Sequence, residues 1–95
     1  MKFKIAEELT IFGRSKLTTM SIGEIAMVVY DDWRPINYAA KPYLEAMASL
    51  HSVNDNYGMD SGYSIIAYFL SNASQWKGDV AKAVKIELKR RLKRG

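Results

Sequence analysis

The sequence has no cysteine and a single histidine, His51, among its 95 residues. Without thiols it has neither a disulfide framework nor a thiolate metal site. One imidazole also leaves little material for catalysis, because active sites combine several titratable groups in one cleft. We therefore expect a protein that is not an enzyme and that uses no cofactor, no metal and no small-molecule substrate.

Long apolar runs are missing as well. No stretch approaches the roughly 18 uncharged apolar residues that a membrane span requires. Glu7 and Glu8 stand where a secretory signal would have its apolar segment. We expect a soluble, cytoplasmic protein that does not engage membranes.

The sequence does have an uneven distribution of charge. The formal net charge is +4. Residues 77–95 hold eight basic and two acidic residues, hence +6, whereas residues 1–76 hold six basic and eight acidic residues, hence −2. A mildly acidic body is thus followed by a strongly basic segment, which bears on partners rather than on the fold.

Two helices are predicted in the first half of the chain. Ser21 and Glu24 form an S-x-x-E capping box, and the apolar stripe that follows ends near Arg34, because the next residue is a proline. The second helix reaches about Leu50. Pro42 is expected in its first turn, where a missing N–H does no harm.

Two more helices are predicted in the second half. A polar loop, His51–Met59, precedes the third helix, which Asp60 or Ser61 caps. Asp79 caps the fourth helix, which runs to about Lys93. Its apolar residues share one face and its lysines occupy the opposite one.

These patterns predict an all-α fold with no strands. We expect one small four-helix domain, orthogonal or bundle-like, over residues 20–95. Residues 1–19 form an N-terminal extension or a short helix, in which Arg14–Thr19 is a polar connection. Three apolar residues of this segment fall at helical spacing: Ile5, Leu9 and Phe12. The alternation of Phe3 and Ile5 would also suit a short strand.

The basic fourth helix is the first candidate site. Its cationic side chains, with one lysine before the helix, form a candidate nucleic-acid-binding set: Lys77, Lys82, Lys85, Lys89, Arg90 and Lys93. Such a stripe suits a phosphate backbone, and Trp76 beside it could add a stacking ring. An acidic protein partner, an anionic surface, or a merely solvated helix whose lysines complement its dipole remain alternatives.

Aromatic residues around the third helix are the second candidate site. They form a candidate protein-binding or homo-oligomer surface: Tyr57, Met59, Tyr63 and Tyr68. The alternative is that these tyrosines are buried with only the hydroxyl in water. Trp33 and Trp76 lie beside helix ends, a position typical of tryptophans that seal the edge of a core; the alternative is that they anchor an interface.

The acidic segments predict no metal site. Asp31 and Asp32 are adjacent in a helix, so their side chains diverge by about 100° and belong to the solvated surface. The segment 54–60 is rich in oxygen ligands but lacks the spacing of an EF-hand. Asx turns around Gly58 account for its composition.

Five segments resemble small uncharacterised helical proteins that are encoded by bacterial phages, plasmids and integrative elements. They are Pro42–Met47, Asp60–Gly62, Tyr68–Ala73, Trp76–Gly78 and Lys85–Lys89. The resemblance covers residues 20–93. It implies an accessory role in a mobile element, names no activity, and favours a binding protein over an enzyme.

Overall fold

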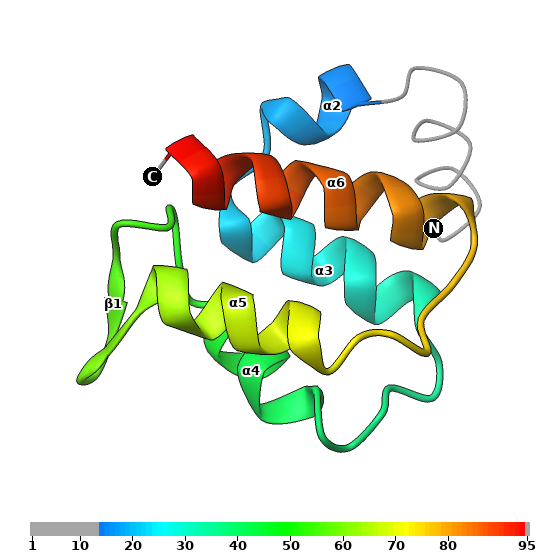
Figure 1. The fold of residues 1–95 in the computed structure, drawn as a ribbon, viewed down its shortest axis with the longest axis horizontal. Coiled ribbons are helices and arrows are strands. Elements are labelled where there is room, and N and C mark those ends of the chain that lie inside the picture. Colours follow the sequence, from blue (N-terminus) through cyan, green and yellow to red (C-terminus); the bar gives the residue numbers. More distant parts are fainter. Residues whose placement is uncertain (1–13, 95) are drawn as a thin grey trace.

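Five helices and one small β-hairpin make up residues 14–94, the part of the chain that the computed structural model describes, with side chains for residues 16–93 (Figure 1). In chain order the elements are α2 (Arg14–Thr18), α3 (Ile22–Asp32), α4 (Lys41–Met47), β1 (Asn56–Tyr57), β2 (Asp60–Ser61), α5 (Gly62–Ser71) and α6 (Asp79–Arg94). The mainly helical class is confirmed. The four-helix, bundle-like architecture is not, since α2 and the hairpin are further elements. The helix expected around Ile5, Leu9 and Phe12 lies outside the described residues.

Capping residues predicted from the sequence fix the helix starts. The Ser21 Oγ accepts the Glu24 N–H at 3.1 Å, and the Glu24 carboxylate accepts the Ser21 N–H at 2.8 Å. Pro42 lies in the first turn of α4. Of the two candidate caps of α5 it is Ser61 that serves, because its Oγ accepts the Ser64 N–H at 3.1 Å.

The start of α3 is also held by the chain that leaves α4. The Ile22 and Gly23 N–H groups donate to the carbonyl oxygens of His51 and Leu50 at 3.0 and 2.8 Å, which satisfies two donors that the helix leaves unpaired. A Cβ on Gly23 would lie 2.7 Å from the Ala48 carbonyl oxygen. Glycine is therefore required for this close approach of α3 and α4.

A polar connection is predicted at Arg14–Thr19, and this prediction is wrong. The chain forms α2 there, and Leu17 is fully buried in the core. The Leu17 carbonyl oxygen accepts a hydrogen bond from the Arg91 Nη2 on α6 at 2.8 Å. Sequence analysis misses α2 because Leu17 is the only apolar residue between positions 14 and 19, and its partner lies 74 residues further on.

The loop predicted at His51–Met59 contains the first strand of an antiparallel hairpin. Tyr57 pairs with Asp60 and Asn56 with Ser61. Gly58, with φ 62°, is the first central residue of the two-residue turn, as in a type II′ turn. Strands of two residues are too short for an alternating pattern to reveal them. Direct cross-strand pairing places the Tyr57 and Asp60 side chains on the same face of the hairpin.

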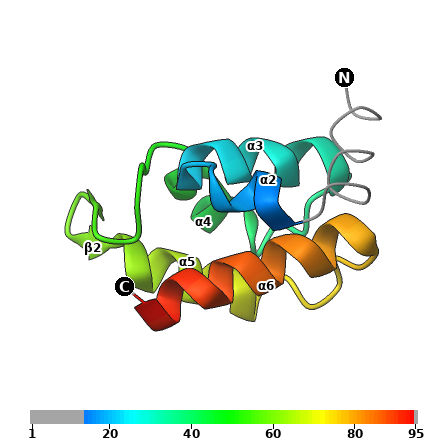
Figure 2. The same cartoon turned by 90° about the horizontal axis from the view of Figure 1, so that it is seen from above.

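The hydrophobic core lies between α3 and α4 on one side and α5 and α6 on the other (Figure 2), and α6 also packs against α2. Where α3 ends and the chain enters α6, the Trp33 and Trp76 rings stack at 5.7 Å and 12°, with Phe69 edge-on to both. Both tryptophans are buried, which confirms that they seal the core. The Trp76 Nε1 donates to the Asp32 carboxylate at 2.9 Å, so Asp32 is a structural acceptor and not the solvated residue that is predicted.

None of the helices within residues 14–94 is both long and apolar enough to cross a membrane.

Candidate functional site

The outward side of α6 is cationic because its apolar residues face the core. Four of them are buried: Val80, Ala81, Val84 and Leu88. Their spacing sets the rotation of the helix and leaves a row of lysines on the other side, which we call the α6 lysine face: Lys82, Lys85, Lys89 and Lys93. With about 1.5 Å of rise per residue, this face is about 16 Å long.

The carboxylate in the middle of α6 does not interrupt this face. Glu87 is only 2% exposed and accepts hydrogen bonds from the Arg90 Nε and Nη2 at 3.0 and 2.6 Å and from the Arg91 Nε at 2.7 Å. Burial acts to raise the pKa of Glu87, but the hydrogen bonds and charges of the two arginines outweigh it and lower this pKa. Arg90, one of the predicted nucleic-acid contacts, thus has two donors committed to Glu87.

Lys85 is also held within the protein. Its Nζ donates to the Trp76 carbonyl oxygen at 2.6 Å and lies 5.9 Å from the centroid of the Trp76 ring. Burial, followed by the positive charges of Lys89 and Lys77, lowers the pKa of Lys85. The fold therefore brings Lys77, which precedes α6, close to the α6 lysine face. The remaining predicted lysines keep exposed side chains: Lys77, Lys82, Lys89 and Lys93.

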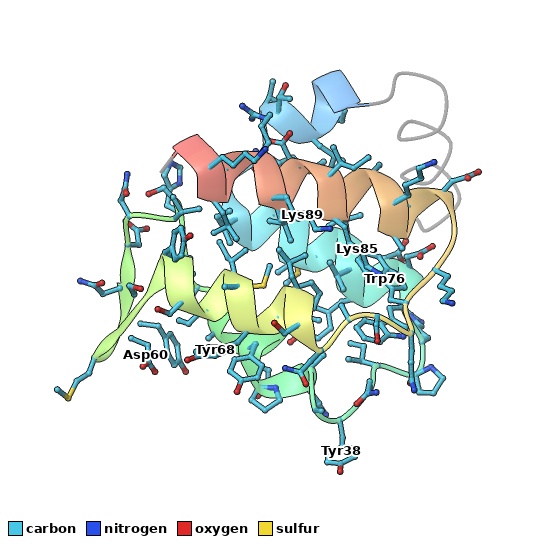
Figure 3. The ribbon with its side chains drawn as sticks, in the orientation of Figure 1. Tyr38, Asp60, Tyr68, Trp76, Lys85 and Lys89 are labelled. Atoms are coloured by element: carbon cyan, nitrogen blue, oxygen red, sulfur yellow. The ribbon has the colours of Figure 1, made fainter. Side chains whose placement is uncertain are left out.

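A recess of about 460 Å³ lies at the N-terminal end of α6. Its lining includes Lys77, Lys82 and Lys85 together with Trp76 and Asp79. Figure 3 shows Trp76 and Lys85 side by side near the start of α6, with Lys89 further along the helix. Three ammonium groups beside the positive end of a helix dipole favour an anion over a cation here, although Asp79 offsets part of this charge.

A second recess, the aromatic pocket, opens between α4, α5 and the hairpin. It has a volume of about 340 Å³, and its lining includes Tyr43, Tyr57, Tyr68, Asp60 and Ser64. The Tyr43 and Tyr68 rings lie 5.5 Å apart at 33°. In Figure 3, Asp60 and Tyr68 lie near each other on the side of α5 that faces away from α6. The pocket is therefore separate from the α6 lysine face.

Two of the four predicted protein-binding residues belong to this pocket. The exposed fractions are 48% for Tyr57, 103% for Met59, 49% for Tyr63 and 56% for Tyr68. Tyr57 and Tyr68 line the pocket, whereas Met59 and Tyr63 do not. The sequence does not single out Tyr43, which falls within the apolar stripe of α4, or Asp60, which is considered there as a helix cap and as part of the oxygen-rich segment 54–60.

Comparison of the chain with protein-family models, with curated proteins and with solved structures finds no match. The function is therefore inferred from the structure itself: a mainly helical fold, a lysine face on its last helix and an aromatic pocket at the other side of α5. The resemblance to proteins of mobile elements stays a prediction. In the described part of the chain, no three His, Asp or Glu side chains are grouped so that they could hold a metal ion.

Proposed function

We propose that this is a non-enzymatic binding protein that contacts nucleic acid through the α6 lysine face. One observation carries the proposal. Between Lys82 and Lys93 the outward side of the helix bears no carboxylate, because Glu87 is buried and paired with Arg90 and Arg91. A continuous cationic stripe is what a phosphate backbone recognises.

The dimensions of the face agree with this role. A length of about 16 Å spans about five phosphates of one strand, at about 3.4 Å of axial rise each. Exposed Lys77 and the recess at the start of α6 extend the stripe beyond the helix. The helix contains no Asn or Gln, the side chains that read adenine, and we expect binding that depends on phosphate contacts more than on sequence. An accessory role in a bacterial mobile element would be compatible with such binding.

The test is fluorescence anisotropy with labelled duplex and single-stranded DNA at about 50 and 200 mM salt. If the four exposed lysines each contact one phosphate, affinity for duplex DNA falls about 100-fold between these concentrations, since each contact contributes about 0.9 to the salt slope. Lys82→Gln/Lys89→Gln should reduce the slope by about 2. Lys85 is left intact because it is bonded to the Trp76 carbonyl oxygen.

The control is Arg34→Gln/Lys41→Gln, which removes the same charge from two exposed residues outside α6. Because the Arg34 Nε donates to the Tyr30 carbonyl oxygen at 3.2 Å, circular dichroism must first show that this variant is folded. It should reduce the salt slope far less than Lys82→Gln/Lys89→Gln does. Equal slopes for the two variants would mean that only net charge matters, and absence of binding at 50 mM salt would end the proposal. If the chain binds an acidic protein in a salt-dependent way and does not bind DNA, the partner of the α6 lysine face is an acidic protein and not nucleic acid.

The aromatic pocket supports a second candidate function, association with a protein partner or with a second copy of the chain. The supporting observation is that Tyr57 and Tyr68 are exposed and both line a recess of about 340 Å³. Association through this surface should tolerate high salt, whereas contacts of the α6 lysine face should not.

A further inference from the structure

We propose that the aromatic pocket binds a cationic side chain, a lysine or an arginine, of a protein partner. The inference rests on the second candidate function and specifies its ligand chemistry. It is independent of nucleic-acid binding, because no residue that lines the pocket belongs to α6.

Three tyrosine rings from three different elements line the pocket. Tyr43 comes from α4, Tyr68 from α5 and Tyr57 from β1. Tyr43 and Tyr68 are tilted against each other at 5.5 Å, and Tyr57 stands opposite Asp60 in the hairpin. The faces of aromatic rings carry negative electrostatic potential, and several rings around one recess are the usual receptor for an ammonium or guanidinium group.

The carboxylate of Asp60 supplies the matching charge. The start of α5 is capped by Ser61, so the helix does not use Asp60. Within residues 14–94, no group donates a hydrogen bond to this carboxylate and no side chain forms an ion pair with it. The protein as a whole carries +4 and repels cations at long range, so the attraction for a cation at this site comes from the three rings and the carboxylate alone.

The surroundings favour a polypeptide as the carrier of the cation. The pocket, at about 340 Å³, is at the small end of the range for ligand sites and suits the end of one long side chain. Met59, at the hairpin turn between Tyr57 and Asp60, is fully exposed. Met59 does not line the pocket, but it directly precedes Asp60, which does, so its flexible thioether is available to pack against the polypeptide that flanks the inserted residue.

The first test uses the full ¹⁵N-labelled chain and two short peptides. Acetyl-Gly-Gly-Lys-Gly-Gly-amide is titrated against the same peptide with norleucine, which keeps the apolar stem and lacks the charge. We expect saturable NMR shifts at Asp60, Ser64 and Tyr68 with the lysine peptide, and at least fivefold weaker binding of the norleucine peptide. Equal binding of both peptides, or no saturable shift with the lysine peptide, overturns the proposal.

The second test uses variants of the pocket. Asp60→Asn and Tyr68→Leu should each lower the affinity for the lysine peptide at least threefold. Tyr68→Phe keeps the ring and should bind this peptide as the wild type does. Tyr38→Leu is the control, because Tyr38 is 87% exposed between α3 and α4 and does not line the pocket (Figure 3). Unchanged binding in Asp60→Asn and Tyr68→Leu, with native spectra, would place the peptide elsewhere and refute the assignment.

The two proposals fail separately. Tyr68→Leu leaves the α6 lysine face intact, so its DNA affinity should equal that of the wild type, whatever the peptide does. Dimerisation that depends on concentration and disappears in Asp60→Asn would make a lysine of a second copy the occupant, and would overturn the assignment to a different partner.

Discussion

Replacement of Glu87 by glutamine tests whether the buried ion pair holds the two ends of the described chain together. Glu87 links Arg90 and Arg91 within α6, and Arg91 continues the link to the Leu17 carbonyl oxygen in α2. Glutamine keeps the size and shape of the side chain. Its amide accepts at one oxygen only, and its NH₂ group must face guanidinium donors.

The structure sets the magnitude of the effect. The Glu87 side chain is 2% exposed and that of Arg91 15% exposed, so the charge of Arg91 would be left largely buried without its counterion. Loss of one partner from a buried pair costs about 3–5 kcal/mol. Because the Arg90 side chain is 40% exposed and glutamine still accepts one hydrogen bond, we expect a loss of about 2–4 kcal/mol in the free energy of unfolding.

The assay is urea unfolding followed by far-UV circular dichroism at neutral pH. Glu45→Gln, at an exposed residue of α4, makes the same chemical change and should alter stability by less than about 0.5 kcal/mol. The Glu87→Gln variant should also lose protection of the α2 amides from hydrogen exchange before the rest of the chain. A stability loss below about 1 kcal/mol would refute the view that this pair is a structural clamp.

Two further predictions concern pH and glycine. Because the folded pKa of Glu87 lies below its ordinary value of 4.5, the contribution of Glu87 to stability is present at neutral pH and is lost as pH falls below about 4.5. The difference in unfolding free energy between wild type and Glu87→Gln should therefore shrink between about pH 5 and pH 3. A constant difference would contradict the assignment. The lowered pKa of Asp55 acts in both proteins and cancels. Gly62→Ala should cost about 2–3 kcal/mol in urea unfolding, because a Cβ would lie 2.8 Å from the Asp55 carbonyl oxygen. Gly58→Ala, with φ 62° but open space around it, should cost only about 1 kcal/mol, and equal costs would contradict the close-approach argument.

Local signals made most of the fold predictable from the sequence. The capping box of Ser21 and Glu24 lies within one helical turn, and so does the preference of Pro42 for the first turn of α4. The apolar stripe of α6 has a period that the sequence displays directly. Each of these features depends only on residues a few positions apart, and each is found where it is predicted.

The parts that could not be predicted depend on contacts between distant segments. Nothing near Leu17 indicates that Arg91 binds its carbonyl oxygen, and nothing near Lys85 indicates that its ammonium turns to the Trp76 carbonyl oxygen. The aromatic pocket joins Tyr43 and Tyr68, 25 positions apart in the sequence, so periodicity could assign Tyr43 only to an apolar stripe. Charge composition located the lysine face, but only the structure tells which of its cations are free.

The stacked indoles make tryptophan fluorescence a probe of one site of the molecule. Both tryptophans, Trp33 and Trp76, sit in one cluster at the junction of α3 with the start of α6, and Trp76 also lines the lysine recess. The aromatic pocket contains tyrosines and no tryptophan. With excitation selective for indole, an anion that enters the recess should change the tryptophan emission. A cation that binds in the aromatic pocket should leave this emission unchanged. Tryptophan emission can therefore distinguish a ligand that binds in the lysine recess from one that binds in the aromatic pocket.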